Sequence, residues 1–275
     1  MYMTQVLSPT LRVALLGAGR VASQLGPALL RAGHRVPYVW SRTPAAAAVL
    51  GTQLPGAQAL TALDFMAHPA ADVYLLAVPD AAVPAVLAAA RFPAGAVVAH
   101  TSGTVPLSVF EAYPELRGGV FYPLQTFSAG RIVDWAEVPL CIEAADPAAE
   151  ATLLALAGTL SRRAQRVATP QRQAVHVAAV FACNFTNHLL GISHALLEAQ
   201  ELPLALLEPL LRETVDKALA FPPFTVQTGP AARRDAPTLA RHRAALAGMP
   251  AWLAVYDALT ASIQGQLPPA PAAEL

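Results

Sequence analysis

A glycine-rich hexapeptide near the N terminus is the clearest candidate for a binding site. It follows a short apolar run, Leu11–Leu16, and opens a helical pattern that extends to Arg31. Its residues are Gly17, Ala18, Gly19, Arg20, Val21 and Ala22. In the spacing G-x-G-x-x-G/A, the first glycine permits a tight turn, the second lets the backbone approach a diphosphate, and the small sixth residue lets helix and strand pack closely. This context predicts dinucleotide binding, and the alternative is a tight turn without a ligand.

The end of the second apolar run, Arg35–Trp40, indicates which dinucleotide would bind. An NAD site carries Asp or Glu here to hold the ribose 2′-hydroxyl, whereas this chain reads Ser41, Arg42 and Thr43. The first acidic residue of the chain is Asp64. Because a guanidinium and two hydroxyls can bind a 2′-phosphate, the sequence favours NADP(H) over NAD(H). The alternative is that Arg42 is a solvated arginine in a loop.

Further candidates follow two later apolar runs, Asp72–Val78 and Ala96–His100. The residues at these ends are Val78, Pro79, Thr101 and Ser102. In open α/β sheets ligands bind beyond the carboxyl ends of the strands. We therefore expect the first two residues to contact the cofactor, and the two hydroxyls to donate hydrogen bonds to the nicotinamide ribose or to a substrate carbonyl. His100 is either a catalytic group or a buried histidine that closes its strand.

A long stretch without charged side chains, residues 173–197, carries a second group of candidates. His176 and Asn184 are eight residues apart, a spacing that places them on one face of an α-helix. Because imidazole exchanges a proton near neutral pH, we expect His176 to act as a general acid or base and Asn184 to hold the substrate or the nicotinamide amide. The alternative is a buried polar network that fixes the helix or a dimer seam. No metal site is expected, because no carboxylate lies nearby.

The elements that would position these residues alternate between apolar runs and helical patterns up to residue 168. The run Asp72–Val78 is almost wholly apolar, as expected of a parallel strand that is covered on both faces. The pattern predicts an α/β fold, with a doubly wound, mostly parallel Rossmann sheet over residues 1–168. Residues 169–275 are expected to form an all-α domain, with a disordered tail at Leu267–Leu275.

The composition limits the classes of function. The chain has 275 residues, of which 55% are hydrophobic and 13% charged, and its formal net charge is zero. A protein that binds nucleic acid usually has a basic excess, so that class is not expected. Residues 1–63 nevertheless carry five arginines and no acid, which places positive charge beside the proposed phosphate site.

The cysteines and the apolar stretch bear on the location of the protein. Cys141 and Cys183 are far apart and match no disulfide framework or zinc spacing, so a reducing, cytoplasmic location is expected. Residues 173–197 are long enough to cross a membrane. Their histidines and asparagines favour a helix buried inside the protein over a membrane span.

The segment Arg233–Arg243 combines four arginines with one acid. One interpretation is that it recognises a carboxylate or phosphate of the substrate. The other is a helix N terminus capped by Asp235, followed by a solvated basic face. The sequence does not assign a role to the most polar members, which are Arg233, Arg234, Asp235 and His242.

Five segments occur in the same order in one bacterial family. They are Ala77–Asp80, His100–Gly103, Tyr122–Phe127, His176–Phe185, and Thr228–Pro230 followed by Arg233, Asp235 and His242. From about residue 11 to 247 the chain resembles bacterial Rossmann-like proteins that carry a helical C-terminal domain of unassigned function and are described as NADP oxidoreductases. Their layout is similar to that of pyrroline-5-carboxylate reductase and of deazaflavin-dependent NADP oxidoreductases.

The resemblance implies an N-terminal NADP-binding domain and a helical domain, of the 6-phosphogluconate-dehydrogenase-like C-terminal type, that often forms a homodimer interface. Two residues depart from the family pattern. Val175 stands where the family tends to have tyrosine, and Arg234 stands where it usually has glycine. Because arginine tolerates a positive φ poorly, the second departure is expected to alter the loop.

The residues and the resemblance together predict an NADP(H)-dependent oxidoreductase that transfers a hydride to or from a small carbonyl or imine substrate. In this hypothesis His176 supplies a proton and Thr101 or Ser102 polarises the reacting group. One alternative is a non-catalytic protein that responds to NADP(H) and acts through its helical domain. Another is a structural homodimer with a vestigial site.

Overall fold

The structure is a computed structural model that describes residues 10–128 and 130–266. The chain divides into two compact units, Met1–Cys183 and Asn184–Leu275. The predicted disordered tail, Leu267–Leu275, lies outside the described residues. The sequence predicts a domain boundary at residue 168, just after the last strand of the sheet. The boundary between the compact units lies later, after Cys183, because the start of the helix that follows the sheet packs against the sheet.

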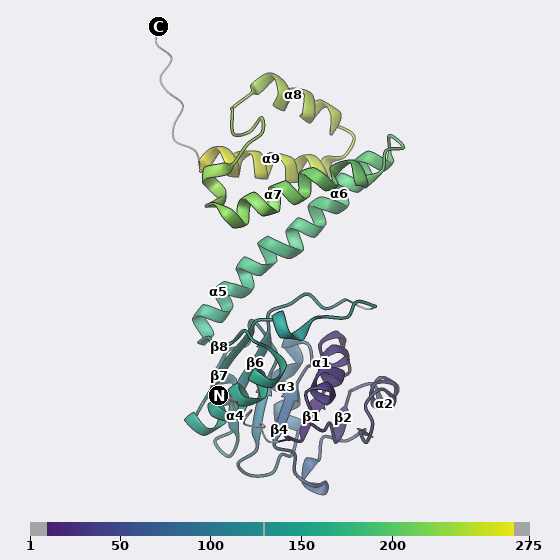
Figure 1. The fold of residues 1–275 in the computed structure, drawn as a ribbon, viewed down its shortest axis with the longest axis vertical. Helices are drawn as coiled ribbons and strands as arrows, with labels where there is room; N and C mark the ends of the chain where they lie inside the picture. Colours follow the sequence, from purple (N-terminus) through teal and green to yellow (C-terminus); the bar gives the residue numbers. More distant parts are fainter. Residues whose placement is uncertain (1–9, 129, 267–275) are drawn as a thin grey trace, which may run out of the picture. The chain divides into compact units, whose positions relative to one another are not determined.

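The first unit is a single eight-stranded sheet with helices on both faces (Figure 1). The strand order is β3-β2-β1-β4-β5-β6-β7-β8. The strands are β1 (Val13–Leu16), β2 (Tyr38–Trp40), β3 (Gln58–Leu60), β4 (Val73–Leu76), β5 (Val97–His100), β6 (Arg117–Pro123), β7 (Leu140–Ala144) and β8 (Ala164–Arg166). The order reverses between β1 and β4, as in a doubly wound fold. The predicted α/β class and Rossmann sheet are therefore confirmed.

All neighbouring strands are parallel except β6 and β7. Parallel neighbours need a crossover connection. The segment between β5 and β6 contains the short 3-10 helix Leu107–Phe110, and α-helices supply the crossover for four other parallel pairs. Those helices are α1 (Arg20–Arg31), α2 (Pro44–Thr52), α3 (Val83–Ala89) and α4 (Pro147–Leu160). Between β6 and β7 the described residues form one short 3-10 turn, Trp135–Glu137, and β7 runs antiparallel to β6.

The sheet is buried on both faces, and successive residues of β1 face opposite cores. Val13 and Leu15 pack in one core with side chains of α1, α2 and α4. Ala14 and Leu16 pack in the other core with α3. This explains the nearly unbroken apolar runs in the sequence, because a strand covered on both faces has no position that faces water.

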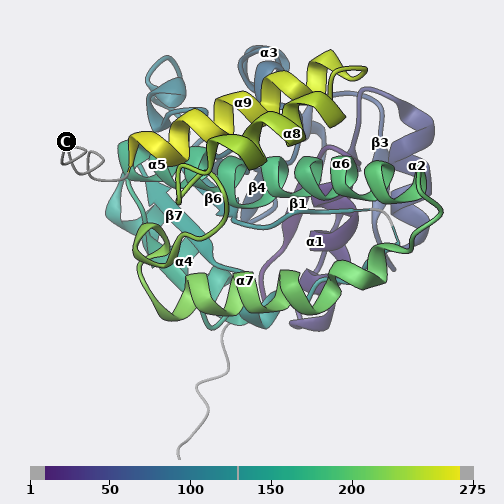
Figure 2. The ribbon, with the colours of Figure 1, turned by 90° about the horizontal axis from the view of Figure 1, so that it is seen from above.

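Among its described residues, the second unit contains helices and connecting loops but no strand. Its helices are α6 (Thr186–Glu198), α7 (Glu208–Ala220), α8 (Ala236–Ala245) and α9 (Pro250–Gly265). Helix α8 lies beside α9 (Figures 1 and 2), and two polar contacts join them. His242 Nδ1 lies 2.9 Å from the Tyr256 hydroxyl, and Arg243 pairs with Asp257 at 2.7 Å.

The charge-free stretch forms a helix, but the expectation that it is buried within the chain is wrong. It comprises α5 (Thr169–Ala179), a π-helical segment (Val180–Phe185) and α6. Within the described residues, the run Thr169–Glu198 is long and apolar enough to cross a membrane, with a mean hydropathy of 1.3 over eighteen residues, none of them buried. Arg172 is the only buried residue of α5, and α6 has none, among the residues that the structure describes.

Candidate functional site

The glycine turn joins β1 to α1, and its two glycines have different structural roles. Gly17 has a φ of 126°, and a Cβ atom there would lie 2.1 Å from the carbonyl oxygen of Ala77, just after β4. Only glycine therefore fits at this position. No atom lies within 4 Å of where a Cβ of Gly19 would stand, so the backbone there borders open space. A diphosphate requires this arrangement, because the backbone must come close to the anion.

The first turn of α1 offers hydrogen-bond donors beside Gly19. This residue is the N-cap, and as a glycine it has no side chain to accept from the helix N–H groups. The first turn of α1 contains no acid. The N–H groups of Arg20, Val21 and Ala22 have no partner inside the helix. Together with the positive end of the helix dipole, they form an anion site that fits a diphosphate. Ala22 is fully buried against the sheet, as the small sixth residue of the motif should be.

The connection from β2 to α2 contains Ser41, Arg42 and Thr43. The Ser41 hydroxyl accepts a hydrogen bond from the Thr43 backbone N–H at 3.3 Å, and Thr43 is the N-cap of α2. Arg42 is exposed and forms no ion pair with any residue that the structure describes. A cavity of about 290 Å³, lined by Ala18, Ser23 and side chains of α2, lies beside the turn. The guanidinium is therefore free to bind a phosphate at this edge.

The end of β4 is tied to the loop that follows β5. Val78 is half-buried and Pro79 is exposed. Asp80 accepts a hydrogen bond of 2.5 Å from the Thr104 hydroxyl. The two strand ends thus lie together at the carboxyl edge of the sheet, where the fold places ligands. That Val78 and Pro79 contact the cofactor stays a prediction.

His100 closes β5 as a fully buried residue, which agrees with the structural interpretation of this histidine. Its Nδ1 accepts a hydrogen bond from the backbone N–H of Ser102 at 3.2 Å. Burial lowers the pKa of His100 to about 4. The imidazole is therefore neutral at physiological pH and holds the backbone of the following turn.

The hydroxyls of Thr101 and Ser102 are both engaged within this turn. Thr101 donates to the carbonyl oxygen of Leu76 at 3.2 Å. The Ser102 oxygen accepts from the backbone N–H groups of Thr104 at 3.0 Å and Val105 at 2.9 Å. In this geometry they fix the shape of the loop. Their predicted role in polarising a substrate stays a prediction.

His176 lies against the sheet through a tyrosine that the sequence analysis did not select. Its Nδ1 is 3.1 Å from the Tyr122 hydroxyl near the end of β6, and the two rings meet edge to face at 6.1 Å. Gly103 lies under both rings, because a Cβ there would come within 2.6 Å of His176 and 2.9 Å of Tyr122. Burial raises the pKa of Tyr122 to about 12, so its hydroxyl stays protonated and can donate to Nδ1. When Tyr122 is the donor, the proton of a neutral His176 is on Nε2, the ring nitrogen away from Tyr122.

The start of α5 is anchored by polar contacts that hold His176 in place. Arg172 is fully buried, pairs with Glu143 of β7 at 2.5 Å and donates to the Val105 carbonyl. Gln173 donates to the Thr104 carbonyl at 2.8 Å. Because these contacts reach the loop after β5, α5 and that loop form one rigid support. Tyr122 stands near the end of β6, and β6 pairs with β5, which ends at His100. A tyrosine at the end of a predicted strand was the sequence signal that could have pointed to this pair.

Asn184 is the first residue of the second unit and is exposed. The interval from His176 to Asn184 crosses the π-helical segment Val180–Phe185. The number of residues per turn between His176 and Asn184 is therefore not that of a pure α-helix, although their predicted shared face requires one. π-Helical segments occur frequently at functional sites. The pairing of Asn184 with His176 stays a prediction.

The arginine-rich segment of the second unit supports the structural interpretation. Asp235 caps α8 by accepting a hydrogen bond from the Thr238 backbone N–H, which agrees with the second of the two interpretations. Arg234 has a φ of 52°, the left-handed conformation that glycine adopts most easily. The loop therefore retains a backbone conformation suited to glycine at a position now occupied by arginine.

Comparison with family models covers most of the chain in two parts. Residues 2–121 match a Rossmann-like domain, and residues 138–263 match a domain of unknown function, DUF2520. A search of curated proteins finds no match.

Among solved structures, a Bacteroides fragilis protein described as a "putative NADP oxidoreductase" is 38% identical, with a TM-score of 0.83 over 93% of this chain and 98% of its own. A reductive aminase from Aspergillus terreus, solved with NADPH and ethyl levulinate, is 16% identical with a TM-score of 0.70, covering 94% of this chain and 98% of its own. An imine reductase from Myxococcus stipitatus, solved with NADP+, is 20% identical with a TM-score of 0.66, covering 94% and 93%.

The two reductases are too distant in sequence to show more than a shared fold. The Bacteroides fragilis protein is similar over nearly the whole of both chains. The chain therefore belongs to the same family as that protein and combines a Rossmann-like domain with a DUF2520 domain.

Proposed function

We propose that this protein is an NADP(H)-dependent oxidoreductase that transfers a hydride to or from a small carbonyl or imine. The observation that carries the proposal is the placement of two groups at the carboxyl edge of one sheet. An anion-binding turn follows β1, and the His176–Tyr122 pair lies beyond β5 and β6. The reductases that share the fold were solved with NADPH or NADP+, which supports the same cofactor here.

The turn Gly17–Ala22 would hold the diphosphate, and Ser41, Arg42 and Thr43 would hold the 2′-phosphate. The nicotinamide supplies or accepts the hydride when it is bound. The protein contributes orientation and a proton. As an imidazolium, His176 would give its Nε2 proton to the substrate oxygen or nitrogen and return to the neutral form, while Tyr122 holds the ring through Nδ1. The loop after β5, which is held by hydrogen bonds of His100 and Ser102, packs against His176 through Gly103.

The uncovered apolar surface supports a further proposal, that the protein is a homodimer through its second unit. Large apolar side chains of α7 are exposed, with Leu210 at 62%, Val215 at 54% and Leu219 at 83%. Large apolar side chains that are this exposed are typical of an interface. Two cysteines without a disulfide are compatible with the reducing cytoplasm, where we place the protein. We expect a small-molecule substrate and no nucleic-acid partner.

Cofactor choice is tested by titrating the protein with NADPH and with NADH and following nicotinamide fluorescence. Arg42→Ser removes the proposed contact to the 2′-phosphate, so we expect NADPH affinity to fall about 10–100-fold while NADH affinity stays unchanged. Arg35→Ser, an exposed arginine at the start of the same strand region, is the matched control and should change neither. Equal affinities for the two dinucleotides in the unmodified protein would contradict the assignment.

Activity is tested by incubating the protein and NADPH with keto acids, aldehydes and cyclic imines and following nicotinamide absorbance. Oxidation of NADPH with one of these classes supports the reductase. Tight NADPH binding without oxidation across the panel would instead support a protein that senses the dinucleotide.

A further inference from the structure

The two parts of the proposed site follow different strands of the sheet. The glycine turn follows β1, and the His176–Tyr122 pair lies beyond β5 and β6. In the strand order, β4 stands between β1 and β5. The segment that leaves β4 at the carboxyl edge of the sheet, Ala77–Asp80, is therefore the part of the chain placed to join the two.

The start of this segment packs against the glycine turn. The Ala77 N–H donates to the Leu16 carbonyl at 2.7 Å, just beyond the last paired residues of β1 and β4. A Cβ atom at Gly17 would stand 2.1 Å from the Ala77 carbonyl oxygen and 3.2 Å from the Val78 nitrogen. Because no room is left between them, a shift of this segment would also move the turn that binds the dinucleotide.

The end of the segment is held by one side-chain contact. Asp80 begins a short 3-10 helix, Asp80–Ala82, and its carboxylate accepts a hydrogen bond from the Thr104 hydroxyl at 2.5 Å. A hydrogen bond from a hydroxyl to a carboxylate is shorter and stronger than one between neutral groups. Both residues are exposed, and Thr104 is the only side-chain partner of Asp80 among the residues that the structure describes. Loss of this bond would leave the carboxylate in water and the hydrogen bonds of the sheet intact.

Thr104 lies in the loop that contacts His176. Its backbone carbonyl accepts a hydrogen bond of 2.8 Å from the side chain of Gln173, three residues before His176 on α5. Gly103 precedes it, and a Cβ atom there would come within 2.6 Å of the His176 ring and 2.9 Å of the Tyr122 ring. Through its hydroxyl, Thr104 therefore links the segment after β4 to the loop that packs against this pair.

Other contacts hold the base of this loop. Thr101 donates from both its backbone N–H and its hydroxyl to the Leu76 carbonyl, at 3.1 and 3.2 Å. The buried Arg172 donates to the Val105 carbonyl on the other side of the loop. Because these contacts stay when the Asp80 bond is removed, the loop should keep its fold and lose only the alignment of its tip with β4.

We propose that Asp80 is a positioning residue that, through Thr104, fixes the His176–Tyr122 pair relative to the dinucleotide turn. This role rests on the proposed oxidoreductase function. Hydride and proton must reach the same substrate, so the nicotinamide and His176 have to be aligned at the same time. A displacement of about 1 Å between reacting groups can cost about 10²-fold in rate. Asp80 acts through the hydrogen bond that it accepts and not through contact with the substrate.

The test is turnover at saturating NADPH on a substrate found in the panel, with variants that remove the bond from either side. Asp80→Ala and Thr104→Val should each lower kcat about tenfold, while the melting temperature and the Kd for NADPH stay unchanged. Because both variants break the same bond, the double variant should lose no more than either single variant. Asp80→Asn keeps an acceptor and Thr104→Ser keeps the hydroxyl, so both should retain kcat within about threefold.

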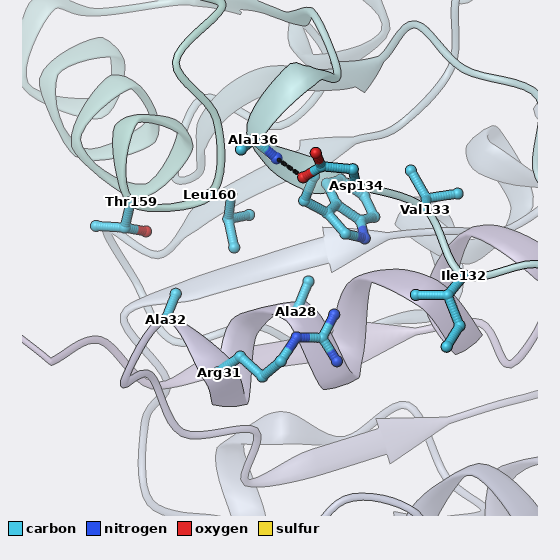
Figure 3. A pocket seen from close by; sticks show the side chains of 10 residues that line it. Ala28, Arg31, Ala32, Ile132, Val133, Asp134, Ala136, Thr159 and Leu160 are labelled. Atoms are coloured by element: carbon cyan, nitrogen blue, oxygen red, sulfur yellow. Dashed lines mark hydrogen bonds between the residues drawn. The ribbon is translucent and has the colours of Figure 1, made fainter.

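Asp134, drawn in Figure 3, offers a matched control. Its carboxylate also lies at a short 3-10 turn, where it accepts a hydrogen bond of 3.1 Å from the backbone N–H of Ala136. It lines a hollow of about 520 Å³ beside the last turn of α1, at the other end of that helix from the glycine turn. Asp134→Ala should therefore leave kcat and NADPH affinity unchanged.

Hydrogen exchange of the amides of residues 103–105, followed by mass spectrometry in the NADPH complex, tests the loop contact without turnover. Exchange should be faster in Asp80→Ala and Thr104→Val than in the unmodified protein, and unchanged in Asp80→Asn and Asp134→Ala. The role of Asp80 is overturned if Asp80→Ala exchanges at the unmodified rate or keeps full kcat. A loss of kcat in Asp80→Asn as large as in Asp80→Ala would also overturn it, because the charge and not the bond would then matter. If no substrate in the panel oxidises NADPH, the proposed function fails, and the exchange experiment still decides whether Asp80 fixes the loop.

Discussion

The His176–Tyr122 contact fixes which ring nitrogen of the histidine faces the sheet, and Nε2 is the nitrogen that lies away from Tyr122. Because burial keeps Tyr122 protonated, its hydroxyl can occupy Nδ1 and leave the proton on Nε2. A second ring pair in the same unit, His68 with Tyr38 at 5.2 Å, lies elsewhere on the sheet. That pair offers a natural control for mutations that remove an imidazole or a hydroxyl.

We expect His176→Asn to lower kcat by about 10²–10⁴ without changing NADPH affinity, because it removes the proton donor and leaves the dinucleotide site intact. Tyr122→Phe should lower kcat by about tenfold and shift the pH profile, since Nδ1 loses its partner. The measurement is turnover against pH on a substrate found in the panel. His68→Asn and Tyr38→Phe should retain full turnover. A His176→Asn variant with unchanged kcat would refute the role.

A second residue-scale prediction concerns acid stability. The pKa of His100 is about 4 in the folded protein, and an unperturbed histidine titrates near 6.5. Between these values the unfolded chain binds a proton that the folded chain excludes, so the free energy of unfolding falls as the pH falls from about 6.5 to 4. The loss from this residue is about 3 kcal/mol.

His100→Asn should flatten this dependence, because the amide oxygen can accept from the Ser102 N–H without titrating. The measurement is urea unfolding between pH 7 and 4.5. Burial also lowers the pKa of His34, so part of the slope will remain. Parallel curves for the variant and the unmodified protein would contradict the assignment.

At the scale of elements, the two glycines of the β1–α1 turn can be separated by mutation. Gly17→Ala meets the Ala77 carbonyl at 2.1 Å and requires a φ of 126°, so it should destabilise the fold by at least about 1–3 kcal/mol and abolish NADPH binding. Gly19→Ala has space for its methyl group and an ordinary φ of −85°. It should leave the melting temperature unchanged and still abolish NADPH binding, because the methyl group would occupy the place of the diphosphate. Equal loss of stability in both variants would show that the turn has only a structural role.

The helix after the sheet is the element for which the sequence analysis was least accurate. The absence of charge in residues 173–197 suggested burial within the chain, and the described residues show an exposed helix instead. Sequence alone reports that a surface avoids water. It does not determine whether that surface is buried by the same chain, by a second copy of the chain or by a lipid bilayer.

At the scale of the whole molecule, the exposed apolar side chains of α7 predict self-association. Sedimentation equilibrium should give twice the chain mass of 28.7 kDa. Leu219→Asp places a charge where the side chain is 83% exposed and should shift the protein to monomer. Met66→Asp, at a residue of the first unit that is 55% exposed, is the matched control and should leave the dimer intact. A monomer in the unmodified protein would contradict the proposal.

The sequence by itself determined the local features: the glycine turn, the fully apolar strands, the cap at Asp235 and the run of helices after the sheet. Each depends on residues close together in the chain, so spacing and residue type suffice to predict it. Tertiary structure alone decided the contacts over long separations. It placed Tyr122 against His176, fifty-four residues apart, and paired the buried Arg172 with Glu143, twenty-nine residues apart. No local pattern encodes such neighbours, because they arise only when strands and helices from distant parts of the chain pack together.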